Sequence, residues 1–339
     1  MRTNRRILCS ILPLFCGILA LILDAPTASK GAREGIALCL ETVVPSLFPF
    51  FFMSALLVGT LRNYRFFAGD FLCRAWNLPK GCESILLIAL TGGYPIGAKT
   101  VSDACEQEMI TKEDTLHMIG FCNNAGPAFI LGITPMLFSM PLIPWILWLL
   151  QILSAWATAK LQGHPGKTAM QEADIQGKVT YTAAMLQSLR SMALVCGWII
   201  LFRVLIALFQ KWLLYPLPVW LRVFVCGLLE LSNGCCMLSE IPHEDVRFFL
   251  CALFLCAGGL CVTMQTVSML HHLDASAYFR GKALQCGICL LMTAASLPFL
   301  FPDSAFPKLA SVISAILLSI VIVFSFVRNS SRKKEENCV

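Results

Sequence analysis

Long apolar runs, separated by short polar stretches, make up most of the chain. Each run is close to the roughly 20 residues that a helix needs to cross the hydrocarbon core of a bilayer. The alternating polarity of barrel strands is not visible, so the runs predict helices. We expect an all-α, polytopic integral membrane protein with about ten hydrophobic segments, at 7–23, 36–61, 84–103, 115–134, 136–159, 183–209, 217–239, 248–270, 283–301 and 309–327.

The composition agrees with a surface that faces lipid. Of the 339 residues, 57% are hydrophobic and 14% are charged, whereas a soluble chain carries about 25% charged residues. The net charge of +6 does not indicate a nucleic-acid partner, because the basic residues lie at the ends of apolar runs and leave no basic stripe with interleaved aromatics. The expected partner is the lipid bilayer.

Two features that suggest a secreted protein have a membrane explanation. Arginines before residues 7–23 resemble a signal peptide, but the apolar run is long and the residues after it form a poor cleavage site. We expect an uncleaved first helix.

Most of the 17 cysteines lie inside apolar runs, where a thiol packs as a small hydrophobe. Cys286 and Cys289 lack the second pair of a zinc site, so no metal is expected.

The two halves of the chain resemble each other. Residues 90–97, 112–115 and 124–127 correspond in order to residues 227–234, 243–246 and 256–259, at offsets of 137, 131 and 132 positions. Duplicated halves with a binding site at their interface are typical of transporters. The expected units are an N-terminal membrane helix at 1–30, a first repeat at 31–160, a polar linker at 161–182, a second repeat at 183–302, and a last helix with a basic tail at 303–339.

The hydropathy pattern leaves the relation between these halves open. Four spanning segments in each half would make the repeats parallel, whereas one re-entrant segment in each half would make them inverted. The candidates for re-entrant segments are 84–103 and 217–239, because Gly, Pro or Asn residues interrupt them.

The stretch 91–100 superficially resembles a phosphate-binding loop. In such a loop the lysine follows the second glycine directly, but Ala98 separates Gly97 from Lys99 here. The backbone cradle for a phosphate therefore fails, and a nucleotide site is not expected.

A break in a membrane helix is the better interpretation of this stretch. Pro95 removes an amide donor, and Gly92 and Gly93 weaken the helix before it, with Tyr94 at the break. A lysine at membrane depth costs about 2.5–3.5 kcal/mol, so Lys99 is expected to face a solute pathway or a partner. The alternatives are that Lys99 snorkels to the interface and that the glycines only permit close helix packing.

A second polar stretch lies in the next apolar run. Asn123 and Asn124 carry amide groups that hydrocarbon cannot satisfy, and Gly126 and Pro127 directly after them predict another helix break. Neutral amides beside an unwound backbone suit a polar organic ligand or an ion. The alternative is that the amides join neighbouring helices by hydrogen bonds.

Embedded charges in the second half extend the candidate site. Arg190 and Glu230 occupy the counterpart of the first-half motifs, near Asn233, and could form an ion pair or lie at an interface. No Ser–His–Asp, HExxH or paired-carboxylate arrangement is visible, so an enzyme is not expected. The histidines that show no metal-ligand spacing are His117, His271 and His272.

At the two broken segments the sequence resembles a known family. The residues that carry the likeness are 93–99 (GYPIGAK) and 121–132 (FCNNAGPAFILG), with 47–50 (LFPF) and 229–234 (LELSNG) in agreement. The chain resembles the YlbJ-type sporulation integral membrane proteins over about residues 30–325. That family is grouped with the nucleoside recognition, or Gate-domain, membrane proteins, which are similar to concentrative nucleoside transporters. The resemblance implies delivery of dipicolinate across the outer forespore membrane of a sporulating bacterium.

The sequence therefore predicts a permease for a small, anionic organic solute. Lys99 would attract a carboxylate, the break before it would expose backbone, and the asparagine stretch would form the facing wall. No ATP-binding domain is visible, so a gradient would supply the energy; no cofactor is expected and the coupling ion is left open. The alternatives are transport of nucleosides or another solute, and a non-transporting scaffold in spore assembly. The sequence also allows a homo-oligomer.

The distribution of basic residues predicts the topology. Eleven of the 26 Lys and Arg residues lie in the N-terminus, the 61–83 loop and the C-terminus, so all three are expected in the cytoplasm. Reporter fusions or cysteine labelling at each place should report the cytoplasmic side. If the reporters place the 61–83 loop outside the cytoplasm, both the predicted orientation and the predicted number of helices are wrong.

Overall fold

The structure, a computed structural model, describes residues 2–60, 69–163, 180–270, 273–303 and 311–317. The elements in these ranges are helices joined by short connections, and no strand occurs among them, so the all-α prediction is confirmed. Residues 61–68 of the basic loop, most of the polar linker, and most of the last segment with its basic tail lie outside the described residues. The domain boundaries predicted there stay predictions.

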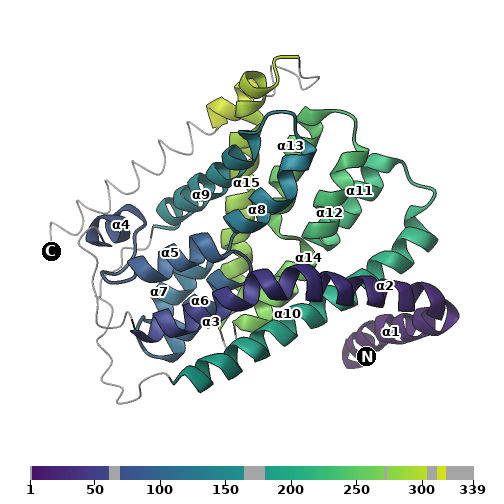
Figure 1. Cartoon of the computed structure of the whole chain (residues 1–339), viewed down its shortest axis with the longest axis horizontal. Helices are drawn as coiled ribbons and strands as arrows, with labels where there is room; N and C mark the ends of the chain where they lie inside the picture. Colours follow the sequence, from purple (N-terminus) through teal and green to yellow (C-terminus); the bar gives the residue numbers. More distant parts are fainter. Residues whose placement is uncertain (1, 61–68, 164–179, 271–272, 304–310, 318–339) are drawn as a thin grey trace.

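A long helical stretch in the first half lies along a long helix of the second (Figure 1). Helix α2 (Ala25–Leu38), the π-helical turn η1 (Cys39–Val43) and α3 (Val44–Thr60) follow one another directly and pack on α10 (Tyr181–Phe209). Gly31 and Gly35 stand one turn apart on α2, and a Cβ on Gly35 would lie 2.9 Å from the Cα atom of Ile200. Small residues at this spacing let two membrane helices approach closely.

The first helix meets α2 at a sharp corner. Helix α1 (Arg2–Leu23) and α2 are bent by 100° at Asp24, whose carboxylate caps α2. The same carboxylate accepts a hydrogen bond from the Lys211 ammonium at 2.6 Å and from the Trp212 indole at 3.1 Å. Both partners lie in η4 (Gln210–Leu214), which continues α10, so an ion pair ties the corner to the second half of the chain.

Two apolar runs of the first half are broken into pairs of short helices. The run 84–103 forms α5 (Glu83–Gly92) and α6 (Ile96–Glu106), which are separated by Gly93 in the left-handed region at φ 79°. The run 115–134 forms α7 (Lys112–Ile119) and α8 (Pro127–Ile133), with an unwound stretch at 120–126. The predicted breaks at both motifs are confirmed.

Two runs of the second half are broken in the same way. Helices α11 (Val219–Leu229) and α12 (Leu231–Met237) are separated by Glu230, which is extended. The run 217–239 is therefore interrupted, as predicted, but the break lies at a glutamate and not at one of its Gly, Pro or Asn residues. Helices α13 (Glu244–Ala257) and α14 (Gly259–Met269) are separated by Gly258 at φ 74°.

Long unbroken helices and short connecting ones complete the fold. Helices α9 and α15 pack side by side, and α13 also packs on α15 (Figure 1). The remaining elements are α4 (Gly69–Ala75), η3 (Thr134–Leu137), α9 (Ile143–Gln162), η5 (Leu238–Glu240) and α15 (Ala275–Leu300).

The number of helices that could each span a membrane is lower than the ten predicted segments. Within the described residues, three helical stretches are long and apolar enough, at Tyr181–Leu214, Glu244–Met269 and Ala275–Leu300. A fourth arises if the bent pair Leu14–Leu23 and Ala25–Val43 is one span. The difference arises because breaks divide several apolar runs into helices of 7 to 11 residues, and each of these is shorter than a bilayer core of about 30 Å requires.

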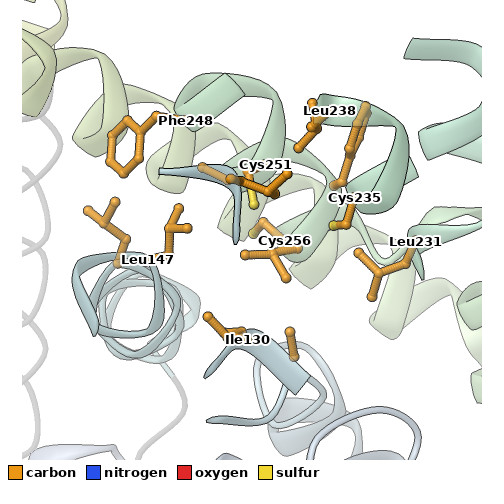
Figure 2. Packing of buried hydrophobic residues seen from close by; sticks show 14 of the residues in the cluster. Ile130, Leu147, Leu231, Cys235, Leu238, Phe248, Cys251 and Cys256 are labelled. Atoms are coloured by element: carbon orange, nitrogen blue, oxygen red, sulfur yellow. The ribbon is translucent and has the colours of Figure 1, made fainter. Parts of the chain in front are cut away.

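Buried cysteines pack in the apolar core, as the sequence predicts. The thiols of Cys251 and Cys256 lie among aliphatic and aromatic side chains that include Ile130, Leu147 and Phe248 (Figure 2). Every cysteine that the structure describes is a free thiol. In the same ranges, no group of three or more His, Cys, Asp or Glu side chains is arranged to hold a metal ion.

The close approach at Gly97 gives a test of the packing around the first break. A Cβ on Gly97 would lie 1.9 Å from the carbonyl oxygen of Cys122, whereas a Cβ on Gly132 of α8 would meet no atom within 4 Å. We expect Gly97→Ala to lose at least about 1–3 kcal/mol of stability, because the backbone must move. Gly132→Ala should stay within about 1 kcal/mol of the wild type. Thermal unfolding in detergent, followed by tryptophan fluorescence, measures both, and equal stability of the two variants would contradict the packing.

Candidate functional site

The four helix breaks are linked by a series of close contacts that involve glycines. A Cβ on Gly93 would lie 2.8 Å from the amide nitrogen of Gly126, so the breaks of α5–α6 and α7–α8 touch. A Cβ on Gly258 would lie 3.3 Å from the Tyr94 ring, and one on Gly259 would lie 3.1 Å from the carbonyl oxygen of Gly227. The short distances, together with the positive φ of Gly93, Gly258 and Gly259, favour glycine at these places, so the glycines bring the breaks of both halves together.

The hydroxyl of Tyr94 bridges the first break to the end of α13. It lies 3.1 Å from the carbonyl oxygen of Leu255 and 3.0 Å from that of Cys256, and it donates its proton to these acceptors. Gly92 ends α5 and Pro95 precedes the first residue of α6, so the side chain of Tyr94 is positioned by the break itself. This tyrosine therefore joins the two halves of the chain.

Asn123 lies in the unwound stretch between α7 and α8 and bonds in two directions. Its side-chain amide donates to the hydroxyl of Thr266 on α14 at 2.7 Å, and its side-chain oxygen accepts from the amide of Ala98 at 3.4 Å. The prediction that the asparagines lie beside an unwound backbone is confirmed. Both side-chain ends of Asn123 are satisfied within the chain, as its alternative role in joining helices requires.

Asn124 is held by α15 and by its own turn. Its amide donates to the carbonyl of Phe121 at 2.7 Å, and its side-chain oxygen accepts from the amide of Gln285. Gly126 and Pro127 follow at the start of α8, where proline is tolerated because the first amide of a helix has no partner within it.

A buried lysine that the sequence interpretation missed lies at the centre of these groups. The ammonium of Lys282 on α15 donates to the hydroxyl of Tyr94 at 3.1 Å, to the backbone carbonyl of Asn123 at 2.6 Å, and to the side-chain oxygen of Gln285 at 3.1 Å. Only 7% of the lysine is exposed. We call the residues joined in this way the Lys282 network; they are Tyr94, Asn123, Asn124, Thr266, Lys282 and Gln285.

The charge of Lys282 has no counter-charge nearby. All three of its hydrogen-bond partners are neutral oxygens, and no carboxylate within the described ranges lies within ion-pair distance of its ammonium. Neutral dipoles satisfy the three N–H donors, but they offset less of the desolvation cost than an anion would. The network is therefore electrostatically ready to accept a negative group.

A second polar group beside the network is left without partners. The side-chain amide of Gln151 on α9 is 1% exposed, and neither its nitrogen nor its oxygen has a hydrogen-bond partner among the described residues. The backbone carbonyl of the same residue lies 3.5 Å from the amide nitrogen of Gln285, which places it next to the Lys282 network. Buried polar atoms without partners are rare in folded proteins, so this amide is a candidate for binding a ligand.

A capping signal could have placed Lys282 inside a helix. The apolar run predicted at 283–301 leaves the lysine as a flanking charge. Asp274 accepts a hydrogen bond from the amide of Ser276 at 2.9 Å and caps α15 two turns earlier. An aspartate is a typical residue before a helix start, and a helix that starts there contains Lys282.

Lys99 is neutralised within its own helix. Its ammonium forms an ion pair with Asp103, one turn further along α6, and both side chains are buried. The sequence predicts that Lys99 faces a solute pathway or a partner, and in the structure its partner is a carboxylate of the same helix. The i,i+4 spacing of an ion pair on one helix face was visible in the sequence.

The predicted partners in the second half do not form the pair proposed for them. Arg190 is exposed on α10, and Glu230 instead caps α12 by accepting from the amides of Ser232 at 2.9 Å and Asn233 at 2.7 Å. The guanidinium that reaches Asn233 belongs to Arg203, at 2.8 Å. No hydrogen bond between described residues joins this group to the Lys282 network. The extended backbone at Glu230, which lets its carboxylate reach two amides, explains why it binds locally.

The fold and the site define an α-helical membrane protein with broken helices whose breaks meet at a buried polar network. Over 125 residues the chain is 28% identical to a protein of Bacillus subtilis (strain 168) named sporulation integral membrane protein YlbJ. The aligned stretch covers 36% of this chain and 31% of that protein, or about a third of each. The predicted resemblance to YlbJ-type sporulation membrane proteins is confirmed over this stretch. No family model matches the chain, and no solved structure matches it.

The Lys99–Asp103 pair leads to a stability prediction. Lys99→Met should leave the Asp103 carboxylate buried and without its counter-charge, at a cost of about 3–5 kcal/mol. The double variant Lys99→Met/Asp103→Asn should recover a large part of this loss, because the neutral amide needs no cation. Thermal unfolding of both purified variants in one detergent measures the effect. If Lys99→Met alone is as stable as the wild type, the ion pair contributes nothing to stability.

Proposed function

We propose that the protein is a membrane permease that moves a small, anionic organic solute. The observation that supports this most strongly is the uncompensated ammonium of Lys282 at the place where the helix breaks meet. A buried positive charge is costly in a membrane protein, and ionisable groups inside the membrane are usually part of a solute or ion pathway. Broken helices beside it supply backbone groups that a soluble ligand can use.

The order of the helices supports an internal repeat, which we propose as the basis of the architecture. In each half, two pairs of short helices precede a long one. The second short pair and the long helix begin 132 residues apart in the two halves, at Lys112 and Glu244, Pro127 and Gly259, and Ile143 and Ala275. Such duplication, with the site between the halves, is the arrangement of secondary transporters and of the Gate-domain proteins that the sequence resembles.

The aligned stretches pair Gly126 with Gly258 and Gly97 with Gly234, and only the first pair agrees with the repeat. Gly126 and Gly258 directly precede α8 and α14, in agreement with it. Gly97 is the second residue of α6, whereas Gly234 is the fourth residue of α12, so their positions relative to the helix starts differ.

The solute that we propose is dipicolinate, delivered during endospore formation. The similarity to a sporulation integral membrane protein of Bacillus subtilis supports a role in sporulation, and the resemblance of the motifs points to the outer forespore membrane. A dicarboxylate also suits a site that has one fixed positive charge and neutral amides around it. Nucleosides, which are neutral, would not require the charge.

A non-transporting scaffold in spore assembly is the second candidate, and mutation of the network separates the two. A scaffold would need the exposed faces of the helices, so it should tolerate buried polar substitutions that preserve insertion. A permease should not.

Transport by the purified protein tests the proposed function directly. Proteoliposomes that contain the wild type should take up labelled dipicolinate faster than empty liposomes. Asn124→Ala should weaken uptake, because the buried amide of Gln285 loses its acceptor. An unsatisfied buried donor of this kind costs about 1–3 kcal/mol of free energy. Ser239→Ala, which removes an exposed hydroxyl on η5, serves as the control and should transport normally. Uptake equal to that of empty liposomes, at normal protein yield, would favour the scaffold.

A further inference from the structure

We propose that Lys282 binds a carboxylate group of the transported solute, and that Lys99 does not. This inference rests on the proposed function and names the residue that recognises the anion. It follows from a comparison of two buried lysines that differ in one respect. Lys99 already has an anion, the carboxylate of Asp103, whereas Lys282 has three neutral oxygens.

The electrostatic argument concerns what each lysine gains from an incoming carboxylate. At Lys99 the solute would have to compete with a covalently tethered carboxylate one helical turn away. At Lys282 it would replace a neutral oxygen with a charged one, and the attraction between opposite charges would add to the hydrogen bond. The site around Lys282 is also shielded from water, and a hydrogen bond is stronger in such a protein interior than it is in water.

The neighbouring amide of Gln151 offers a second anchor. Its NH2 group, with two donors, and its carbonyl oxygen have no partner among the described residues, and it lies on α9, which packs along α15. A solute that places one carboxylate on the Lys282 ammonium and another polar group on Gln151 would satisfy the charge and the amide together. The ligand class is therefore a compact organic acid with at least two polar ends.

The place of Lys282 in the fold links binding to the helix breaks. Two of its three partners, Tyr94 and Asn123, belong to the breaks of α5–α6 and α7–α8. A carboxylate that takes one donor of the ammonium must release one of these oxygens or that of Gln285. Binding of the anion would in this way loosen a contact between segments that the lysine holds together.

A comparison of a charged and a neutral probe of the same shape tests this inference. The probes are dipicolinate and pyridine-2,6-dicarboxamide, each used to inhibit uptake of the other in proteoliposomes. The wild type should prefer the dicarboxylate by at least about tenfold, and Lys282→Gln should lose most of that preference. The ratio of the two affinities does not depend on the fraction of folded protein, so a loss of yield cannot imitate the result.

Two matched variants separate the role of Lys282 from the general effect of positive charge. Arg280→Gln removes an exposed charge from the same helix, and Lys99→Gln/Asp103→Asn removes the ion pair of α6. Both should keep the preference of the wild type. An equal loss in either variant, or an unchanged preference in Lys282→Gln, would overturn the assignment to Lys282 and leave the permease intact. A wild type that takes up neither probe would overturn the proposed function and this inference with it.

A titratable replacement covers the case in which Lys282→Gln yields no folded protein. In Lys282→His the preference for the dicarboxylate should increase as the pH falls from about 8 to about 5, because the imidazole gains its charge on acidification. A preference of Lys282→His that does not change with pH would contradict the inference.

Discussion

The ammonium of Lys282 is the interaction on which the arrangement of the broken helices depends. Its three hydrogen bonds reach the first break, the unwound stretch after α7, and the next turn of α15. Tyr94 extends the same network to the end of α13, and Asn123 extends it to α14. Segments far apart in the sequence are thus joined through one charge, which is held by neutral oxygens instead of an acid. A charge solvated in this way differs from an ordinary buried ion pair, in which an acid of the protein already compensates the cation.

The breaks themselves follow from a conflict between apolar composition and backbone geometry. An apolar run favours a continuous helix in lipid, but glycine and proline at its middle remove hydrogen bonds and side-chain packing. The freed backbone groups need partners, which in a membrane must come from protein or from a polar pathway. Here Gly93 and Gly126 let two breaks touch, and the freed carbonyls of Leu255, Cys256 and Asn123 accept from Tyr94 and Lys282.

The two buried lysines show how one residue type takes two roles in the same environment. The pair of Lys99 and Asp103 is closed within one helix, so its charge is compensated before the helix meets any neighbour. Lys282 can be compensated only by what other helices bring to it. The likeness to a sporulation membrane protein covers about a third of the chain, so the assignment of roles within the site depends on this geometry and not on the relative.

The sequence by itself determined the helical class, the membrane character and the positions of the breaks at Gly93–Pro95 and Gly126–Pro127. Those features are local, because apolar composition, glycine and proline act on the residues next to them. The same local reasoning overestimated the number of spans, since a break inside an apolar run does not lower its hydropathy. The partners of the charges were decided only by the tertiary structure. The i,i+4 spacing of Lys99 and Asp103 on one helix makes their ion pair predictable from the sequence. Lys282, in contrast, bonds to Tyr94 and Asn123, which lie more than 150 positions away in the sequence. No periodicity connects such residues; only the packing of α15 against the breaks does.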